Sequence, residues 1–244
     1  MDKSIPVGAA VLLRFIAKTE VSRIEPECYE VIYGHNQDKL PRPITKMTLA
    51  QIQSAQSGWT KNYGSSATGA YQFMKATLAG LITEMKISDL TIFTGDVQDR
   101  MGYHLLKRRG YTEFMSGAIS RDEFAKRLAQ EWASFPVLNP TQGASRKIIR
   151  GQSYYAGDGV NKALVNPVTV ETILDQIKMV NKGDAVTHVV VDAVVPIPAV
   201  NTAPVVPKAA VVVGLVTVLA GAISASSPWL SAYACTMFGL ACGN

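Results

Sequence analysis

The stretch IPVGAAVLLRFIAKTE, residues 5–20, combines a helix signal with an acidic residue at its end. Pro6 stands near the expected start of a helix over Ile5 to Lys18, where a fixed φ and a missing N–H are tolerated. Arg14 interrupts the apolar run, no small-residue cleavage site follows it, and the run is too short to span a bilayer. We therefore predict a first core helix, with an apolar stripe formed by Val11, Leu12, Phe15 and Ile16.

Helical signals continue from this segment to about residue 180, with one short β-prone interruption. The interruption is Tyr29-Glu30-Val31-Ile32-Tyr33, which favours a small hairpin beside a helical lobe. Cap residues mark several helix starts, and Gly110 marks a stop. The sequence therefore predicts an α+β, mainly α domain over residues 1–183. Its further helices are expected over Leu49–Ala55 after Thr48, Phe73–Lys86, Asp96–Arg109 after Thr94, a segment after the Ser120/Glu123 capping box, and Val170–Val180.

The composition changes after Gly183. Residues 184–208 are rich in Val, Ala and Pro, and the prolines exclude a continuous helix, so we expect a semi-rigid linker. Beyond Lys208 no charged side chain occurs, and residues 209–230 are long enough to cross a hydrocarbon core of about 30 Å. We predict a transmembrane helix there, followed by a short uncharged tail over 231–244. A buried hydrophobic hairpin is the alternative.

The composition of the chain limits its function classes. The net charge of +5 suits attraction to an anionic polymer such as cell wall, and equally an ordinary soluble surface. No basic run or helix combines Lys and Arg with aromatics, so no nucleic-acid partner is expected. Cys28, Cys235 and Cys242 lack CxxC spacing or a neighbouring His, and the three histidines are scattered. We therefore expect no metal site.

Two segments offer chemistry suited to a glycan. Glu20 ends the first predicted helix, where the helix dipole disfavours a carboxylate, and an apolar setting there keeps a carboxylic acid protonated near neutral pH. Ser65 to Phe73 is a small-residue loop entering a helix. In this loop Gly69 allows close approach of a ligand, Tyr71 offers an aromatic surface, and Gln72 offers an amide for a sugar N-acetyl group. A solvated Glu and an ordinary turn are the simpler interpretations of each segment alone.

Taken in order, these segments and four others resemble the lysozymes of lambda-like phages and their muramidase and transglycosylase relatives, over roughly residues 8–180. The resemblance implies a two-lobed lysozyme-like fold with a peptidoglycan groove, Glu20 as the catalytic acid, and no metal or cofactor. It implies substrate binding by Gly69, Tyr71, Gln72 and Tyr33, with Trp132 in the core beneath the cleft. The matching segments are Thr19-Glu20, Tyr29–Gly34, Gly69–Phe73, Asp96–Arg100, Glu131–Pro136 and Gly151–Gly157.

A second catalytic carboxylate is not evident in the sequence. If Glu20 works alone, the C6 hydroxyl of N-acetylmuramic acid attacks intramolecularly and a 1,6-anhydro product forms, which is the lytic transglycosylase route that the resemblance implies. The alternative is a hydrolytic muramidase, for which a second acid is needed. Candidates for that acid are Glu25, Glu27, Glu30 and Asp38, whose simpler interpretation is as solvated surface residues.

Other functions stay open at this stage. A membrane-anchored virion or lysis protein that binds peptidoglycan without cleaving it is one alternative, and a tail that makes membrane lesions, as a holin does, is another. We expect membrane association through 209–230, in the host inner membrane or a virion, and action on periplasmic peptidoglycan. The basic residues before the tail place the enzyme domain on the cytoplasmic side by the positive-inside rule, so delivery requires release at lysis or an entry device.

Overall fold

The computed structural model describes residues 1–181, which form helices and one short hairpin. The helices are α1 (Val7–Val21), α2 (Leu49–Tyr63), α3 (Lys75–Glu84), α4 (Gly95–Arg108), α5 (Tyr111–Ser116), α6 (Arg121–Glu131) and α7 (Pro167–Asn181). Strands β1 (Thr141–Gln142) and β2 (Lys147–Ile148) pair antiparallel. Short 3-10 helices cover Glu27–Glu30, Tyr33–His35, Gln37–Lys39 and Ile44–Lys46.

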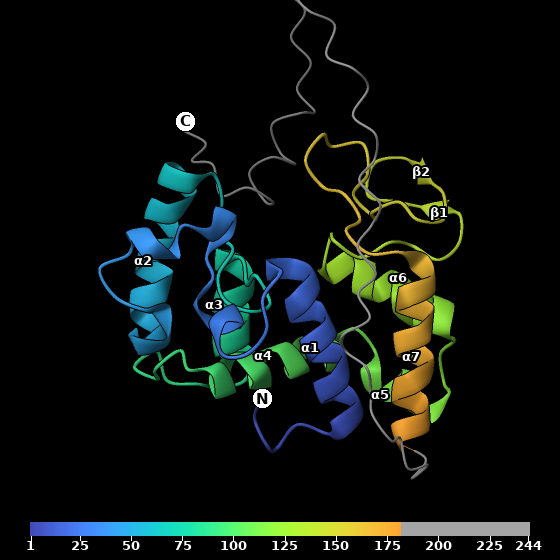
Figure 1. Ribbon diagram of the computed structural model, residues 1–244, viewed down its shortest axis with the longest axis horizontal. Coiled ribbons are helices and arrows are strands. Elements are labelled where there is room, and N and C mark those ends of the chain that lie inside the picture. Colours follow the sequence, from blue (N-terminus) through green and yellow to red (C-terminus); the bar gives the residue numbers. More distant parts are fainter. Residues whose placement is uncertain (182–244) are drawn as a thin grey trace, which may run out of the picture. The chain divides into compact units, whose positions relative to one another are not determined.

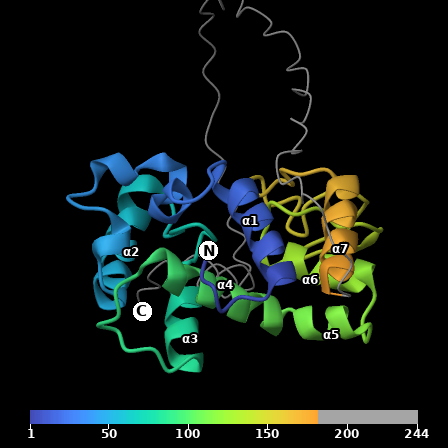
Figure 2. The ribbon, with the colours of Figure 1, turned by 60° about the horizontal axis from the view of Figure 1, so that its bottom comes forward.

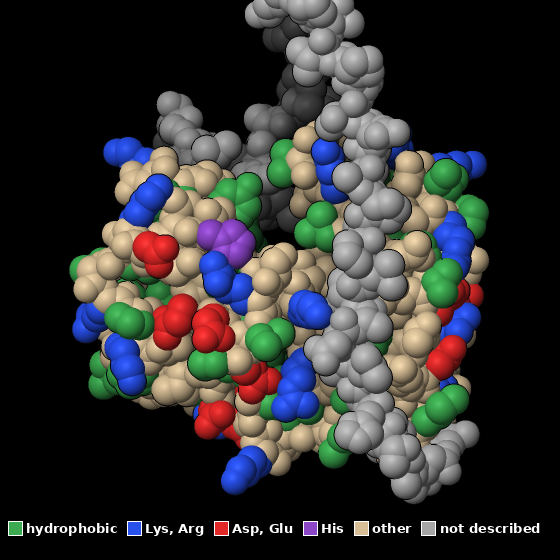
Figure 3. All heavy atoms as spheres, viewed as in Figure 1, with side chains coloured by type: hydrophobic (Ala, Val, Ile, Leu, Met, Phe, Trp, Pro, Cys, Tyr) green, Lys and Arg blue, Asp and Glu red, His purple; other side chains and the backbone are tan. Residues whose placement is uncertain are grey.

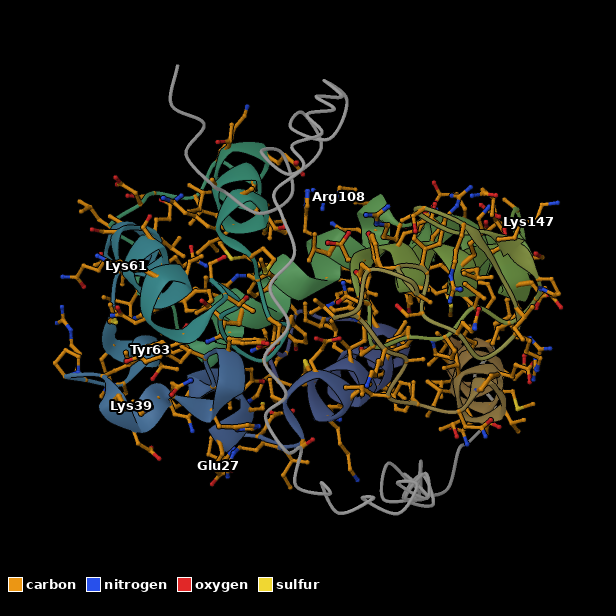
Figure 4. All side chains as sticks on the ribbon, turned by 90° about the horizontal axis from the view of Figure 1, so that it is seen from above. Glu27, Lys39, Lys61, Tyr63, Arg108 and Lys147 are labelled. Carbon is orange, nitrogen blue, oxygen red and sulfur yellow. The ribbon has the colours of Figure 1, made fainter. Side chains whose placement is uncertain are left out.

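The helices form two lobes, with α1 and α4 as a central pair of helices that joins them. Helices α2 and α3 and the 3-10 helices make an N-terminal lobe, and α5, α6, α7 and the hairpin make a C-terminal lobe (Figures 1 and 2). Helix α4 runs from one lobe to the other, and α1 lies between them. From above, the lobes lie on either side of α1, with Lys61 and Lys147 towards opposite ends (Figure 4). The predicted two-lobed, mainly helical architecture is confirmed.

Helix α1 is the centre of the core, as its sequence predicts. Residues from Ala9 to Leu13 and from Phe15 to Ala17 are buried, so the helix is apolar on nearly every side. A helix of that kind requires neighbours all round. It packs against α4 and α7, and only Arg14 within this stretch is exposed. Because α1 is held on all sides, the residue at its C-terminal end has a fixed position between the lobes.

The predicted helix starts are confirmed at Thr48, Thr94 and Ser120. Each of these side chains accepts a hydrogen bond from the backbone N–H three residues on. Helix α2 runs further than predicted, to Tyr63 rather than Ala55, and α3 is shorter than the predicted 73–86 segment. Caps are local signals, whereas helix ends depend on what the last turn packs against.

Removing the α2 cap is expected to cost about 1 kcal/mol in the free energy of unfolding. Thr48 and Gln51 form a reciprocal capping box: Thr48 Oγ1 accepts from Gln51 N at 3.2 Å, and Gln51 Oε1 accepts from Thr48 N at 3.0 Å. Thr48→Ala breaks the first bond, and chemical denaturation measures the loss. Thr83→Ala is the control, since the exposed Thr83 hydroxyl only bonds back to Ala79 O within α3. An equal loss in both variants would contradict the role of the cap.

The hairpin predicted around residues 29–33 is wrong. That segment holds 3-10 helices instead, and its extended part forms only an isolated bridge between Ile32 and Thr68. The β-prone side chains Tyr29, Val31 and Ile32 are buried among helices, so tertiary packing rather than strand pairing uses them. The hairpin of the described residues lies far along the chain, in β1 and β2.

The predicted linker 184–208, transmembrane helix 209–230 and tail 231–244 lie outside the described residues. Within residues 1–181, no helix has the length and apolar character needed to cross a membrane.

Candidate active site

Glu20 lies in the last turn of α1, at the level where the two lobes meet. The helix ends because Ser22 adopts a left-handed conformation, with φ of 54°, and donates its N–H to Lys18 O at 3.0 Å. The C-terminal end of a helix carries a partial negative charge, which disfavours a second negative charge there. The position of Glu20 therefore favours the neutral carboxylic acid.

The carboxyl group of Glu20 is largely shielded from water, but the residue is not fully buried. The residue is half-buried, and its Oε1 accepts a hydrogen bond from the Ser134 hydroxyl. Burial raises the pKa of Glu20 to about 7, and the hydrogen bond from Ser134 acts in the opposite direction. A carboxyl group with this pKa holds a proton at neutral pH and is able to release it, which is the requirement for a general acid.

Ser134 belongs to a turn, residues 132–136, that directly follows α6. Trp132 N bonds to Leu128 O at 2.8 Å and Phe135 N to Trp132 O at 3.0 Å, which ends the helix and closes the turn. The Phe135 ring meets Phe15 of α1 edge to face, with centroids 5.6 Å apart. Phe15 lies five residues before Glu20 on α1, so this aromatic contact brings the 132–136 turn against the end of the helix.

The 69–73 segment reaches the same junction from the N-terminal lobe. Trp132 is 3% exposed, as predicted for a core residue, and its indole N–H donates to Tyr71 O at 3.2 Å. Gln72 follows directly, is half-buried and adopts φ of 50°, with its Nε2 bonded to Gly69 O at 2.9 Å. A left-handed glutamine costs about 1 kcal/mol or more, and such strain is often kept at functional sites. Two predicted site segments thus meet through Trp132.

The aromatic surface predicted for Tyr71 is almost wholly buried in the structure. Tyr71 is 2% exposed, and its hydroxyl donates to Asp99 Oδ1 at 2.7 Å. Asp99 is wholly buried and also accepts from the Tyr29 hydroxyl at 3.0 Å and from Asp2 N at 2.7 Å. Burial raises the pKa of the Asp99 carboxyl, while these hydrogen bonds lower it. The structure therefore corrects the role of Tyr71 to a support beneath the site, anchored on Asp99.

The role expected for Gly69 also changes. Gly69 is buried, with φ of 75°, and a Cβ on it would lie 2.3 Å from Gln98 Oε1. That oxygen accepts the Ala70 N–H at 2.9 Å, and Gln98 Nε2 donates to Tyr29 O at 3.0 Å. The close approach that glycine permits is thus made by Gln98 from inside the protein rather than by a ligand from outside.

Tyr33 remains a candidate for contact with a substrate. Its side chain is 43% exposed, and its N–H donates to Ala67 O at 3.0 Å, which ties it to the loop before Gly69. Sequence reasoning missed Ser134 and Asp99 as members of the site. Both fall inside segments of the family resemblance, and that membership is the signal by which the sequence could have identified them.

The four carboxyl groups considered as a second acid lie in other settings. Glu25 pairs with Arg14 at 3.0 Å and with the Met1 ammonium group, and Glu30 binds the hydroxyl and N–H of Thr45. Glu27 and Asp38 are exposed. Among the described residues, none of these four hydrogen-bonds to Glu20 or Ser134.

Neither the charged side chains nor Cys28 indicates a second reactive site within residues 1–181. Basic and acidic side chains are interspersed on the face shown in Figure 3. Within residues 1–181, no group of three or more His, Cys, Asp or Glu side chains is arranged to hold a metal ion. Cys28 is buried, and burial raises the pKa of its thiol to about 12, which leaves it unreactive at neutral pH.

A half-buried carboxylic acid with its pKa raised to about 7, at the junction of two helical lobes, is the kind of group that general-acid catalysis requires. A family model described as Endolysin matches residues 10–160, more than half of the chain. The chain therefore belongs to the endolysin family, phage enzymes that degrade peptidoglycan. No curated protein and no solved structure matches the sequence. The matched range contains Glu20 and Ser134.

Proposed function

We propose that this endolysin cleaves the glycan strands of peptidoglycan at the β-1,4 bond between N-acetylmuramic acid and N-acetylglucosamine, with Glu20 as the catalytic acid. The observation that carries the proposal is the Glu20 carboxyl, half-buried at the lobe junction with its pKa raised to about 7. Protonation of the leaving oxygen by such a group contributes about 10²–10⁴-fold in rate. Gln72 and Tyr33 are the proposed sugar contacts.

The lytic transglycosylase route suits this site better than hydrolysis. Hydrolysis requires a second carboxylate to activate water or to attack the sugar. Glu25 and Glu30 are already held by other partners, and Glu27 and Asp38 are exposed. In the intramolecular route the C6 hydroxyl of N-acetylmuramic acid replaces the water, so a single group serves first as acid and then as base. A pKa of about 7 suits both steps.

Digestion of purified sacculi in ¹⁸O-labelled water is expected to give 1,6-anhydro muropeptides without ¹⁸O. No water enters the product when the C6 hydroxyl is the nucleophile, so each new end is lighter by one water than a reducing end. Mass spectrometry of the released muropeptides measures both properties. A parallel digest with Glu20→Gln enzyme shows the background of anhydro ends already present in the sacculi.

Reducing ends that carry ¹⁸O would mean a hydrolytic muramidase, and would direct the search for the second acid to Glu25, Glu27, Glu30 and Asp38. Binding to sacculi without any released muropeptide would instead support a non-catalytic peptidoglycan-binding protein. Either result contradicts the transglycosylase proposal.

A further inference from the structure

The hydrogen bond between Ser134 and Glu20 distinguishes the two oxygens of the catalytic carboxyl group. The Ser134 hydroxyl donates to Glu20 Oε1, which therefore acts as an acceptor. A neutral carboxylic acid has one oxygen that accepts and one that carries the proton. The donor on Oε1 thus favours the form of Glu20 whose proton is on Oε2.

The Ser134 hydroxyl is held in place from three directions. Ser134 is 6% exposed, and its carbonyl accepts the N–H of Leu164 at 2.7 Å. The preceding carbonyl, of Ala133, accepts the hydroxyl of Ser153 at 2.7 Å. The backbone on both sides of the Ser134 side chain is thus tied to the loop that leads to α7, and Phe135 anchors the turn on α1. A donor fixed in this way is preorganised for the charge that appears on Glu20.

We propose that Ser134 is a positioning residue that sets the roles of the two Glu20 oxygens, with Oε1 as the hydrogen-bond acceptor and Oε2 as the oxygen that gives and takes back the catalytic proton. This inference rests on the proposed role of Glu20 as the acid.

The proton balance of the reaction follows directly. In the first step the Oε2 proton moves to the glycosidic oxygen as its bond to C1 of N-acetylmuramic acid breaks, and Glu20 becomes a carboxylate. The Ser134 hydrogen bond then stabilises the new negative charge. In the second step the C6 hydroxyl oxygen bonds to C1, and its proton returns to Oε2. Glu20 ends protonated, as it began.

Ser134 also limits how far burial raises the pKa of Glu20. Burial raises that pKa to about 7, and the Ser134 hydrogen bond, which is stronger to the carboxylate than to the acid, lowers it. Burial and the Ser134 hydrogen bond are the two causes of this shift. The charged and titratable groups on the surrounding segments are Lys18 and Arg23 beside Glu20, Glu131 with its partners Arg108 and Arg109, and Tyr154 and Tyr155.

Ser134→Ala is the direct test, because it removes one oxygen from a buried turn and leaves the backbone contacts in place. We expect the pKa of Glu20, measured by ¹³C carboxyl NMR titration, to rise by about one unit or more, the shift that loss of a charge-assisted hydrogen bond produces. The alkaline limb of the kcat/KM profile should move upward by the same amount. At pH 5, where Glu20 is protonated in both proteins, kcat should still fall about tenfold because the hydrogen bond that stabilises the Glu20 carboxylate formed in the first step is lost.

Thr19→Ala is the matched control, since the Thr19 hydroxyl, next to Glu20 in the chain, bonds back to Phe15 O within α1 at 2.9 Å and not to Glu20. It should leave the Glu20 titration unchanged, and Ser134→Thr, which keeps the hydroxyl, should restore the titration. An unchanged midpoint in Ser134→Ala, or an equal shift in Thr19→Ala, overturns the inference. If Glu20→Gln keeps its activity, the proposed function fails instead, and the two failures are separable because the titration does not depend on turnover.

Discussion

Glu20→Gln is expected to reduce peptidoglycan cleavage by about 10²–10⁴-fold or more, because the variant keeps the side-chain volume and loses the transferable proton. The amide carbonyl oxygen of the substituted side chain still accepts the hydrogen bond that Ser134 gives to Oε1 of Glu20, so the local structure is preserved. Turbidity clearing of chloroform-treated Gram-negative cells by purified protein measures the loss. Wild-type activity should itself decline as pH rises through about 7, where Glu20 gives up its proton.

The same variant is expected to be more stable than wild type at high pH. The folded-state pKa of Glu20 is raised from 4.5 to about 7, so its contribution to stability is fully present below the lower value and is lost as pH rises through the upper one. The loss is about 2–3 kcal/mol, allowing for partial exposure. Glu20→Gln lacks this penalty. Urea denaturation of both proteins at pH 5 and pH 8 should show a stability advantage of the variant that is larger at pH 8.

Glu27→Gln serves as the matched control for both measurements. Glu27 is exposed in its 3-10 helix, and Figure 4 shows it at the edge of the molecule. Its substitution should change neither clearing nor the pH dependence of stability. Near wild-type clearing by Glu20→Gln, with Glu27→Gln equally active, would refute Glu20 as the acid.

Local signals in the sequence were sufficient to predict where α2, α4 and α6 begin and to single out Glu20 as a candidate acid. The caps at Thr48, Thr94 and Ser120 were predicted because each bonds to a backbone N–H only three residues away. Glu20 was identified from its place after an apolar helix and from a family resemblance. Both features depend on residues that are neighbours in the chain, and for such features a single sequence carries the information.

The partners of the site residues depend on contacts across the fold and were not predicted. Ser134 lies 114 residues from Glu20 in the chain, and Asp99 lies 28 residues from Tyr71. The polarity of a serine alone does not show whether it is buried and hydrogen-bonded to a carboxyl group, as Ser134 is, or exposed to solvent. The β-prone residues near Tyr29 were misread for the same reason, since their burial among helices depends on which elements meet. The sequence predicts a close approach at Gly69, but assigns it to a bound ligand. In the structure the group that approaches Gly69 is the Gln98 amide, from the protein interior.

Gly69→Ala is expected to destabilise the protein by about 2–4 kcal/mol. A left-handed conformation costs an alanine about 1–2 kcal/mol, and Gly69 has φ of 75°. The new Cβ also has to displace the Gln98 amide, whose Oε1 would lie 2.3 Å away. Gln98 holds Ala70 N and the carbonyl oxygens of Tyr29 and Phe93, so moving it leaves buried polar groups unpaired at about 1–3 kcal/mol.

Gly117→Ala separates the two contributions to this loss. Gly117 has φ of 85°, and a Cβ there meets no atom within 4 Å, so this variant has the backbone strain without the collision. Urea denaturation should show a loss of about 1 kcal/mol for Gly117→Ala and two to three times that for Gly69→Ala. In a Gln98→Ala background the collision with the Gln98 amide is absent and a 3.2 Å approach to the Phe93 ring remains. Gly69→Ala should then cost less than it does in the wild-type background, which a double-mutant cycle measures. Equal losses at the two glycines in the wild-type background would contradict tight packing of Gln98 on Gly69. In that case the close approach at Gly69 would be open to a ligand after all.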